Sequence, residues 1–270
     1  MARVFAVLGY RRAIPSLILC AGETGPEAVS CMLALVAMGR TEAAPVLRRQ
    51  LRTSDDPEVV AAAGLTLAAW RDTFSHSLFV RALMEGRGGE IGGIALVLAI
   101  DRTENRMERD YLRFVRMTSQ YPLVRLTATA RLAGRMSGWR AGAINRELRQ
   151  TLAETLEGES WGEVPSLRAR LAVWGLSRAG EGGCTVLLRR LARNHELGSH
   201  RAARVVEVLP QLNGECMAQA RREAPALFKV AAAAGMTDRE RTAAFPLPAL
   251  SPRLDPTDLV DSLIVLSNRF

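Results

Sequence analysis

The sequence predicts an all-α protein: an α-solenoid, or superhelix, of about six stacked helix pairs with a degenerate C-terminal cap. Three observations predict it. A residue pattern recurs every 31 to 33 residues with one longer interval, each recurrence contains an apolar helical segment, and no segment alternates in polarity between hairpin turns. The composition agrees, because 48% of the residues are hydrophobic and only 5% are aromatic, which disfavours a β-sandwich.

The recurring pattern places proline or glycine at the start of the second helix of each pair. These starts are Pro26, Pro57, Gly89, Pro122, Pro165 and Gly198. Proline suits the first helical turn because its missing N–H has no partner there. Asp55 or Asp56 is expected to cap the helix that starts at Pro57, and Gly39 to end the helix before it.

The helix pairs follow from this register. First helices are predicted near 11–20, 41–52, 74–85, 106–117, 143–157 and 183–194. Second helices are predicted near 26–38, 57–70, 89–100, 122–134, 165–178 and 198–209. One interval is 43 residues long, and a longer first helix followed by the loop 157–164 explains it.

A further motif precedes the first helices. The pattern GxxxAxPxL at residues 9–17 returns at 39–47. Together with the period and the proline-bearing turn, it resembles HEAT repeats, particularly the short subclass similar to bilin-lyase HEAT-like repeats, over about residues 5–212. The resemblance implies a superhelix whose second helices form the concave wall. It implies no single function, since scaffolds, adaptors, regulatory subunits, lyases and a group of DNA glycosylases share such arrays.

Two regions are expected along the chain. Residues 1–235 form the HEAT-like α-solenoid, and residues 236–270 form a Pro-rich extended segment followed by a C-terminal helix. Four prolines between 245 and 256 predict the extended backbone. The helix over 257–270 either folds back onto its own array or docks on another protein.

Arginine dominates the charge of the chain. Lys and Arg number 36 against 28 Asp and Glu, a net +8, and Lys229 is the only lysine. Arginine binds carboxylates and phosphates in bidentate fashion, so the excess is consistent with an acidic protein partner or a nucleic acid. A coding bias toward arginine gives the same excess, and both interpretations stay open.

An arginine recurs at the equivalent position of three successive second helices. The three are Arg125, Arg168 and Arg201, and stacking would align them as a ladder. By the HEAT resemblance this ladder lines a concave partner-binding groove with the neighbouring arginines Arg131, Arg170 and Arg204. Internal pairing with an aspartate of the preceding turn is the alternative, but these three turns lack that aspartate. The arginines of the first helices, among them Arg189, Arg190 and Arg193, are interpreted as a solvated face.

The sequence shows no catalytic constellation. His195 and His200 are five residues apart, with no cysteine or carboxylate at ligand spacing, so no metal site is expected. No tryptophan has the acid four residues later that the resemblance to HEAT-like glycosylases requires. We expect no catalytic residues and no cofactor.

The four cysteines, Cys20, Cys31, Cys184 and Cys216, are scattered and form no CxxC pair. Buried free thiols in a reducing compartment are expected, and with them a cytoplasmic location. The longest apolar stretches, such as 91–100, are well short of a membrane span. Arg11 and Arg12 interrupt the apolar N-terminus, which disfavours a secretory signal.

The sequence therefore favours a non-catalytic scaffold or adaptor that binds an acidic partner protein on the concave face of a HEAT-like solenoid. Two alternatives stay open. One is a nucleic-acid-binding HEAT-like protein, and the other is an enzyme resembling the bilin lyases. An enzymatic role is the less favoured.

Overall fold

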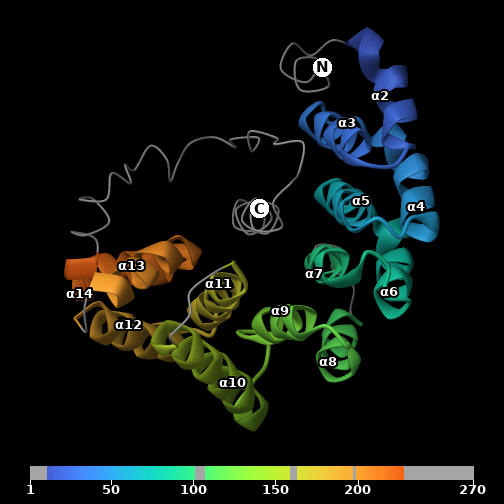
Figure 1. The fold of residues 1–270 in the computed structure, drawn as a ribbon. Helices are drawn as coiled ribbons and strands as arrows, with labels where there is room; N and C mark the ends of the chain where they lie inside the picture. The colour runs from blue at the N-terminus through green and yellow to red at the C-terminus, as the bar shows by residue number, and fades with distance from the viewer. Residues whose placement is uncertain (1–10, 101–106, 159–162, 197–198, 228–270) are drawn as a thin grey trace. The chain divides into compact units, whose positions relative to one another are not determined.

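The computed structural model describes residues 11–100, 107–158, 163–196 and 199–227, and every regular element in these ranges is a helix (Figure 1). The predicted all-α class is therefore confirmed for this part of the chain. The chain divides into two compact units. The described residues up to Arg125 belong to unit 1, and those from Leu126 belong to unit 2.

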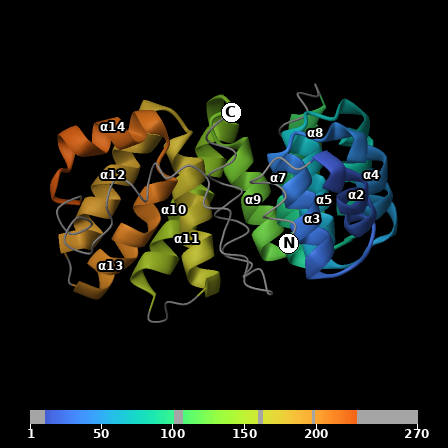
Figure 2. The same ribbon diagram turned by 90° about the horizontal axis from the view of Figure 1, so that it is seen from above.

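Unit 1 contains two layers of helices. Its α-helices are α2 (Ile14–Ala21), α3 (Pro26–Ala37), α4 (Ala44–Thr53), α5 (Pro57–Ala69), α6 (His76–Met84), α7 (Gly89–Ile100) and α8 (Glu108–Thr118). The short 3-10 turns η1 (Arg11–Ala13), η2 (Thr41–Ala43) and η3 (Thr73–Ser75) lead into α2, α4 and α6. Helices α3, α5 and α7 pack on one another in order, and α2, α4 and α6 cover them (Figures 1 and 2).

Helix α9 (Pro122–Leu132) contains the division between the units, and the later helices lie in unit 2. These are α10 (Gly138–Glu157), α11 (Glu163–Ser177), α12 (Glu181–Glu196), α13 (Ser199–Val208), η5 (Leu209–Gln211) and α14 (Gly214–Glu223). Helix α10 packs on α11, α11 packs on α12 and α13, and α12 packs on α13 and α14. A longer first helix was predicted for the 43-residue interval, and α10 is 20 residues long, although it begins at Gly138 and not near 143. Helix α11 begins at Glu163, two residues before the predicted start at Pro165, and residues 159–162 of the predicted loop lie outside the described residues.

Two signals placed the helix boundaries correctly. The Oδ1 atom of Asp56 accepts hydrogen bonds from the backbone N–H of Glu58 at 3.0 Å and of Val59 at 3.3 Å, so Asp56 is the cap of α5. Gly39 has a φ of +63°. Its N–H donates to the carbonyl of Val36, and the N–H of Arg40 donates to Leu35, which closes the end of α3 in a Schellman motif.

Glycines within the second helices allow close helix packing. A Cβ atom on Gly93 of α7 would lie 2.7 Å from Cγ2 of Val124 in unit 1. A Cβ on Gly175 of α11 would lie 2.8 Å from Cα of Ala130 in unit 2. Real Cβ atoms do not approach other atoms so closely, and buried close-packed cores absorb added volume poorly. Both positions therefore require glycine.

The expectation of free thiols is wrong. Cys20 of α2 is bonded to Cys31 of α3, and Cys184 of α12 is bonded to Cys216 of α14. Their Cα atoms are 6.1 and 5.6 Å apart, within the range that a disulfide spans. The cytoplasmic location rested on free thiols and has lost that support, because disulfides persist in oxidising compartments. The location itself stays a prediction.

Other predictions concern residues beyond 227. The Pro-rich segment and the C-terminal helix over 257–270 lie outside the described residues. Within the described ranges, no helix is both long enough and apolar enough to cross a membrane.

Candidate anion-binding site

The six arginines predicted to bind a partner do not share one environment. Arg125 is the last described residue of unit 1, and the other five belong to unit 2. The side chains of these five differ in their contacts. Arg131 is buried, and Arg170 and Arg204 bind neighbouring groups of the protein. Arg168 is half exposed, and Arg201 lines a pocket.

Arg131 is buried in unit 2. Its side chain is 3% exposed, and its Cζ lies 4.6 Å from the centroid of the Trp174 ring, which is fully buried. The Cζ of Arg178 lies 4.8 Å from the same centroid. Cations over an indole ring gain most when both partners are desolvated. Arg131 therefore contributes to the packing of α9 on α11 and presents no charge to solvent.

Arg170 and Arg204 are held by groups of unit 2. The NH2 atom of Arg170 lies 2.9 Å from Oε1 of Glu207, and the Arg170 side chain is only 13% exposed. The NH1 atom of Arg204 donates to the carbonyl oxygens of Leu156 at 3.0 Å and Gly158 at 2.6 Å. Arg204 thereby satisfies carbonyls at the C-terminal end of α10, where a helix leaves acceptors without partners.

Internal partners also exist for two of the three ladder residues. Arg125 donates to the carbonyl of Ser119 at 2.7 Å. Arg168 lies 3.6 Å from Oε2 of Glu154. The preceding turns do lack an aspartate, yet the inference that Arg168 is therefore unpaired is wrong, because the long helix α10 supplies the acid. The pair is half exposed and contributes little stability.

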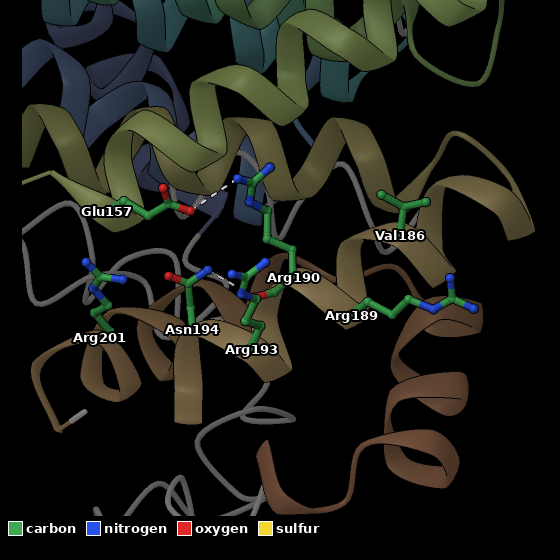
Figure 3. Close-up of a pocket in the computed structure, with 7 residues that line it drawn as sticks. All are labelled: Glu157, Val186, Arg189, Arg190, Arg193, Asn194 and Arg201. Carbon is green, nitrogen blue, oxygen red and sulfur yellow. Dashed lines mark hydrogen bonds and ion pairs between the residues drawn. The ribbon is translucent and has the colours of Figure 1, made fainter. Parts of the chain in front are cut away.

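Arg201 is the ladder residue that lines a pocket. The pocket has a volume of about 510 Å³ and is built from the end of α10, the part of α12 from Val186 to Asn194, and the first turn of α13. Its described lining consists of Glu157, Val186, Arg189, Arg190, Arg193, Asn194 and Arg201. In Figure 3, Arg201 lies at the Glu157 end, Arg189 lies at the Val186 end, and Arg193 and Asn194 lie between them.

Helical spacing places three of these arginines at the pocket. Arg189 and Arg193 are four residues apart on α12, and residues at this spacing are neighbours on one helix face. Arg190 and Asn194 have the same spacing. Like charges at this spacing repel one another and destabilise the helix slightly. The arrangement is therefore unfavourable for α12 unless an anion compensates it.

One of the four guanidinium groups is neutralised. The NH2 atom of Arg190 lies 3.1 Å from Oε1 of Glu157, and NH1 of Arg190 donates to the carbonyl of Arg149 at 3.4 Å. Arg189, Arg193 and Arg201 form no ion pair within the described part of the chain. Four guanidiniums and one carboxylate give the lining a formal charge of +3.

Asn194 contributes a buried hydrogen-bond acceptor to the pocket. Its side chain is 2% exposed, and its Nδ2 donates to the carbonyl of Arg190 at 3.0 Å. Its Oδ1 is buried and has no hydrogen-bond partner among the described residues. A buried acceptor without a donor costs about 1–3 kcal/mol. A ligand with an N–H or O–H group at this point would remove that penalty.

Sequence reasoning found only Arg201 of this pocket. It interpreted Arg189, Arg190 and Arg193 as a solvated face, since a charge run on a helix usually is one. The available signal was the i, i+4 repetition of arginine with no acid at helical spacing within 186–193. The sequence does not show that α10 and α13 enclose this face of α12.

The described lining consists of arginine, asparagine, glutamate and valine side chains. It carries no histidine, cysteine or hydroxyl group, and no group of three His, Cys, Asp or Glu side chains able to hold a metal ion occurs in the described ranges. Comparisons of the chain with protein-family models, with curated proteins and with solved structures found no match.

Proposed function

We propose that this protein is a non-catalytic binding protein of the HEAT-repeat type, a scaffold or adaptor that captures an acidic segment of a partner protein. The observation that carries the proposal is the arginine-lined pocket, where three guanidiniums have no ion pair in the described residues. Arginine forms strong bidentate hydrogen bonds with carboxylates. The stacked second helices of unit 1 support the repeat assignment.

The proposed contact surface is narrower than the six-arginine groove expected from the sequence. Arg201 remains in it, joined by Arg189 and Arg193. Arg168 lies outside the pocket lining and is half exposed beside Glu154. Arg131, Arg170 and Arg204 act within unit 2 by the contacts described above, so we propose no direct partner contact for them.

Features of the pocket favour a protein partner over nucleic acid. Single-stranded nucleic acid is usually held by aromatic side chains that stack on the bases, and no aromatic ring is found in the described lining. A peptide supplies N–H donors for Oδ1 of Asn194, whereas a DNA backbone has none. The pigment-binding alternative needs an apolar pocket, and Val186 is the one apolar residue in this lining.

Peptide binding to the full chain tests the proposal. A fluorescein-labelled ten-residue peptide rich in glutamate, with one central serine, is titrated by fluorescence anisotropy. Its lysine-for-glutamate counterpart and a single-stranded DNA of equal charge are titrated in parallel. We expect binding of the acidic peptide alone, weakened about tenfold in Arg193→Gln/Arg201→Gln because two charge-assisted contacts are lost.

The matched control is Arg52→Gln/Arg222→Gln, which removes the same charge at two exposed positions outside the pocket. This variant should bind like the unmodified chain. Equal weakening of both double variants would show that net charge, not the pocket, captures the peptide, and would overturn the proposal. Preference for the DNA would favour the nucleic-acid alternative instead.

A further inference from the structure

We propose that the pocket is a phosphate-binding site and that its ligand is a phosphorylated side chain of the partner segment. This inference rests on the proposed function and specifies its ligand. The phosphate would lie between Arg193 and Arg201, with a backbone N–H of the segment donating to Oδ1 of Asn194. The remainder of the segment would extend toward Arg189 and Val186, along the direction seen in Figure 3.

The charge of the pocket matches a dianion. A side-chain carboxylate carries one negative charge, whereas a phosphate monoester carries about 1.5 to 2 at neutral pH and offers three acceptor oxygens. The lining has a formal charge of +3. One carboxylate would leave most of that charge uncompensated. A phosphate compensates more of it and provides an acceptor oxygen for each of several guanidiniums.

The helix dipole does not account for the arginines. Basic residues in the last turn of a helix offset the partial negative charge there, which is about half a unit. Arg193 and His195 already lie in the last turn of α12. Arg189 lies a turn earlier, and Arg201 belongs to α13, so the positive charge of the pocket exceeds what the dipole offsets.

The volume and Asn194 indicate that the phosphate is attached to a carrier. A volume of about 510 Å³ falls in the range of pockets that hold drug-sized ligands, well above the needs of a single anion. Oδ1 of Asn194 requires a donor. A phosphorylated peptide is large enough to occupy this volume. The backbone N–H groups next to its phosphorylated residue are donors for Oδ1 of Asn194.

The test compares three peptides that differ at one position. The glutamate-rich probe is prepared with serine, glutamate or phosphoserine at its centre, and each is titrated against the full chain. We expect the phosphoserine peptide to bind about tenfold more tightly than either other form, because phosphate contacts with arginine are charge-assisted and bidentate. Competition with O-phosphoserine and with inorganic phosphate separates a peptide-borne group from a free phosphate.

Single-residue variants test whether the preference for phosphoserine arises in the pocket. Arg193→Gln and Arg201→Gln should each reduce the preference for phosphoserine to less than about threefold, and Arg222→Gln should preserve it. Circular dichroism confirms that each variant is folded. Equal binding of the three peptides would overturn the phosphate inference and leave the proposed function intact. Failure of all three to bind would overturn the proposed function itself. Displacement by O-phosphoserine as strong as by the whole peptide would overturn the assignment to a partner protein.

Discussion

Cys184 and Cys216 join α12 to α14, the last helix that the structure describes, with Cα atoms 5.6 Å apart. Cys20 and Cys31 likewise join α2 to α3, the first two α-helices that the structure describes. In each case the two bonded helices also pack on each other within one unit. Each disulfide therefore adds a covalent link to a contact that packing already makes.

Reduction of the two disulfides is expected to lower the free energy of unfolding. The bonds close chain segments separated by 11 and 32 residues, and the loop-entropy model gives about 3 and 4 kcal/mol respectively. Thermal unfolding with and without reductant measures the effect. A lower melting temperature in reductant is expected for the unmodified chain, and a smaller shift for Cys184→Ser/Cys216→Ser. Alkylation of four free thiols without prior reduction would contradict the pairing.

A second prediction concerns Arg48 and Asp72 in unit 1. Nε of Arg48 donates to Oδ2 of Asp72 at 2.9 Å, and the hydroxyl of Ser75 donates to the same carboxylate. Burial alone raises the pKa of Asp72, but the hydrogen bonds from Arg48 and Ser75 outweigh it and lower the pKa below its ordinary value. A lowered pKa in the folded state means that the ionised carboxylate stabilises folding.

This stabilisation is present above the ordinary aspartate pKa and is lost as the pH falls through the lowered one. Asp72→Asn should lower the free energy of unfolding by about 1–2 kcal/mol at pH 7, with a difference that shrinks toward pH 3. Chemical denaturation at both pH values measures it. Arg48→Ala should behave alike, whereas Arg49→Ala, an exposed neighbour, should have little effect. A constant difference from pH 7 to pH 3 would exclude this titration.

A third prediction uses Arg71, which occupies the position of Gly39 one period later. Arg71 has a φ of +52°, and Asp72 N–H donates to the carbonyl of Leu67 at 3.0 Å in the same Schellman pattern. A left-handed conformation costs a non-glycine residue about 1–2 kcal/mol, partly offset by the greater entropy of an unfolded glycine. Arg71→Gly should therefore stabilise unit 1 by about 0.5 kcal/mol.

Gly39→Ala is the matched comparison. A Cβ there would meet no atom within 4 Å, so any loss reports backbone strain and not a clash. We expect a loss of about 1 kcal/mol. Urea denaturation measures the free energy of unfolding of both variants. A lower value for Arg71→Gly than for the unmodified chain would show that contacts of the Arg71 side chain stabilise the fold.

A fourth prediction separates a packing role from a binding role for Arg131. Arg131→Ala removes a buried side chain from the Trp174 ring and should cost at least about 2 kcal/mol of stability. Affinity of the folded variant for the acidic peptide should be unchanged. A loss of affinity without a loss of stability would restore Arg131 to the partner-binding surface that the sequence predicted.

The sequence predicted the helices well because their boundaries depend on local chemistry. Pro26, Pro57 and Pro122 each begin a helix because of their own backbone constraints, and Asp56 caps one through groups two and three residues away. The disulfides depend on which helices touch, which Cys184 and Cys216 do not reveal from 32 residues apart.

The same difference between local and tertiary information explains which features of the candidate site the sequence predicted. Arg201 was found from its register in the repeat, which is local information. Glu154 and Glu157 were missed as partners because α10 carries them from a different part of the chain to Arg168 and Arg190. Whether an arginine is available for a partner therefore depends on tertiary contacts that repeat position does not encode.

Glu157 provides the last prediction, a gain of affinity. Its carboxylate holds Arg190 and subtracts one charge from the pocket, and both side chains are partly exposed, at 48% and 33%. Glu157→Gln should leave stability nearly unchanged, since exposed pairs contribute little. It should tighten binding of the acidic peptide about three- to tenfold, because Arg190 is released and the lining gains a unit of charge.

Glu154→Gln is the control for that gain. Glu154 lies one turn earlier on α10 and pairs with Arg168, but it does not line the pocket. Both substitutions raise the net charge of the chain equally. A pocket-specific site predicts tighter binding for Glu157→Gln alone, whereas attraction by net charge predicts the same gain for both. Anisotropy titrations of the two variants at low and at physiological salt therefore distinguish a built site from a diffuse basic surface.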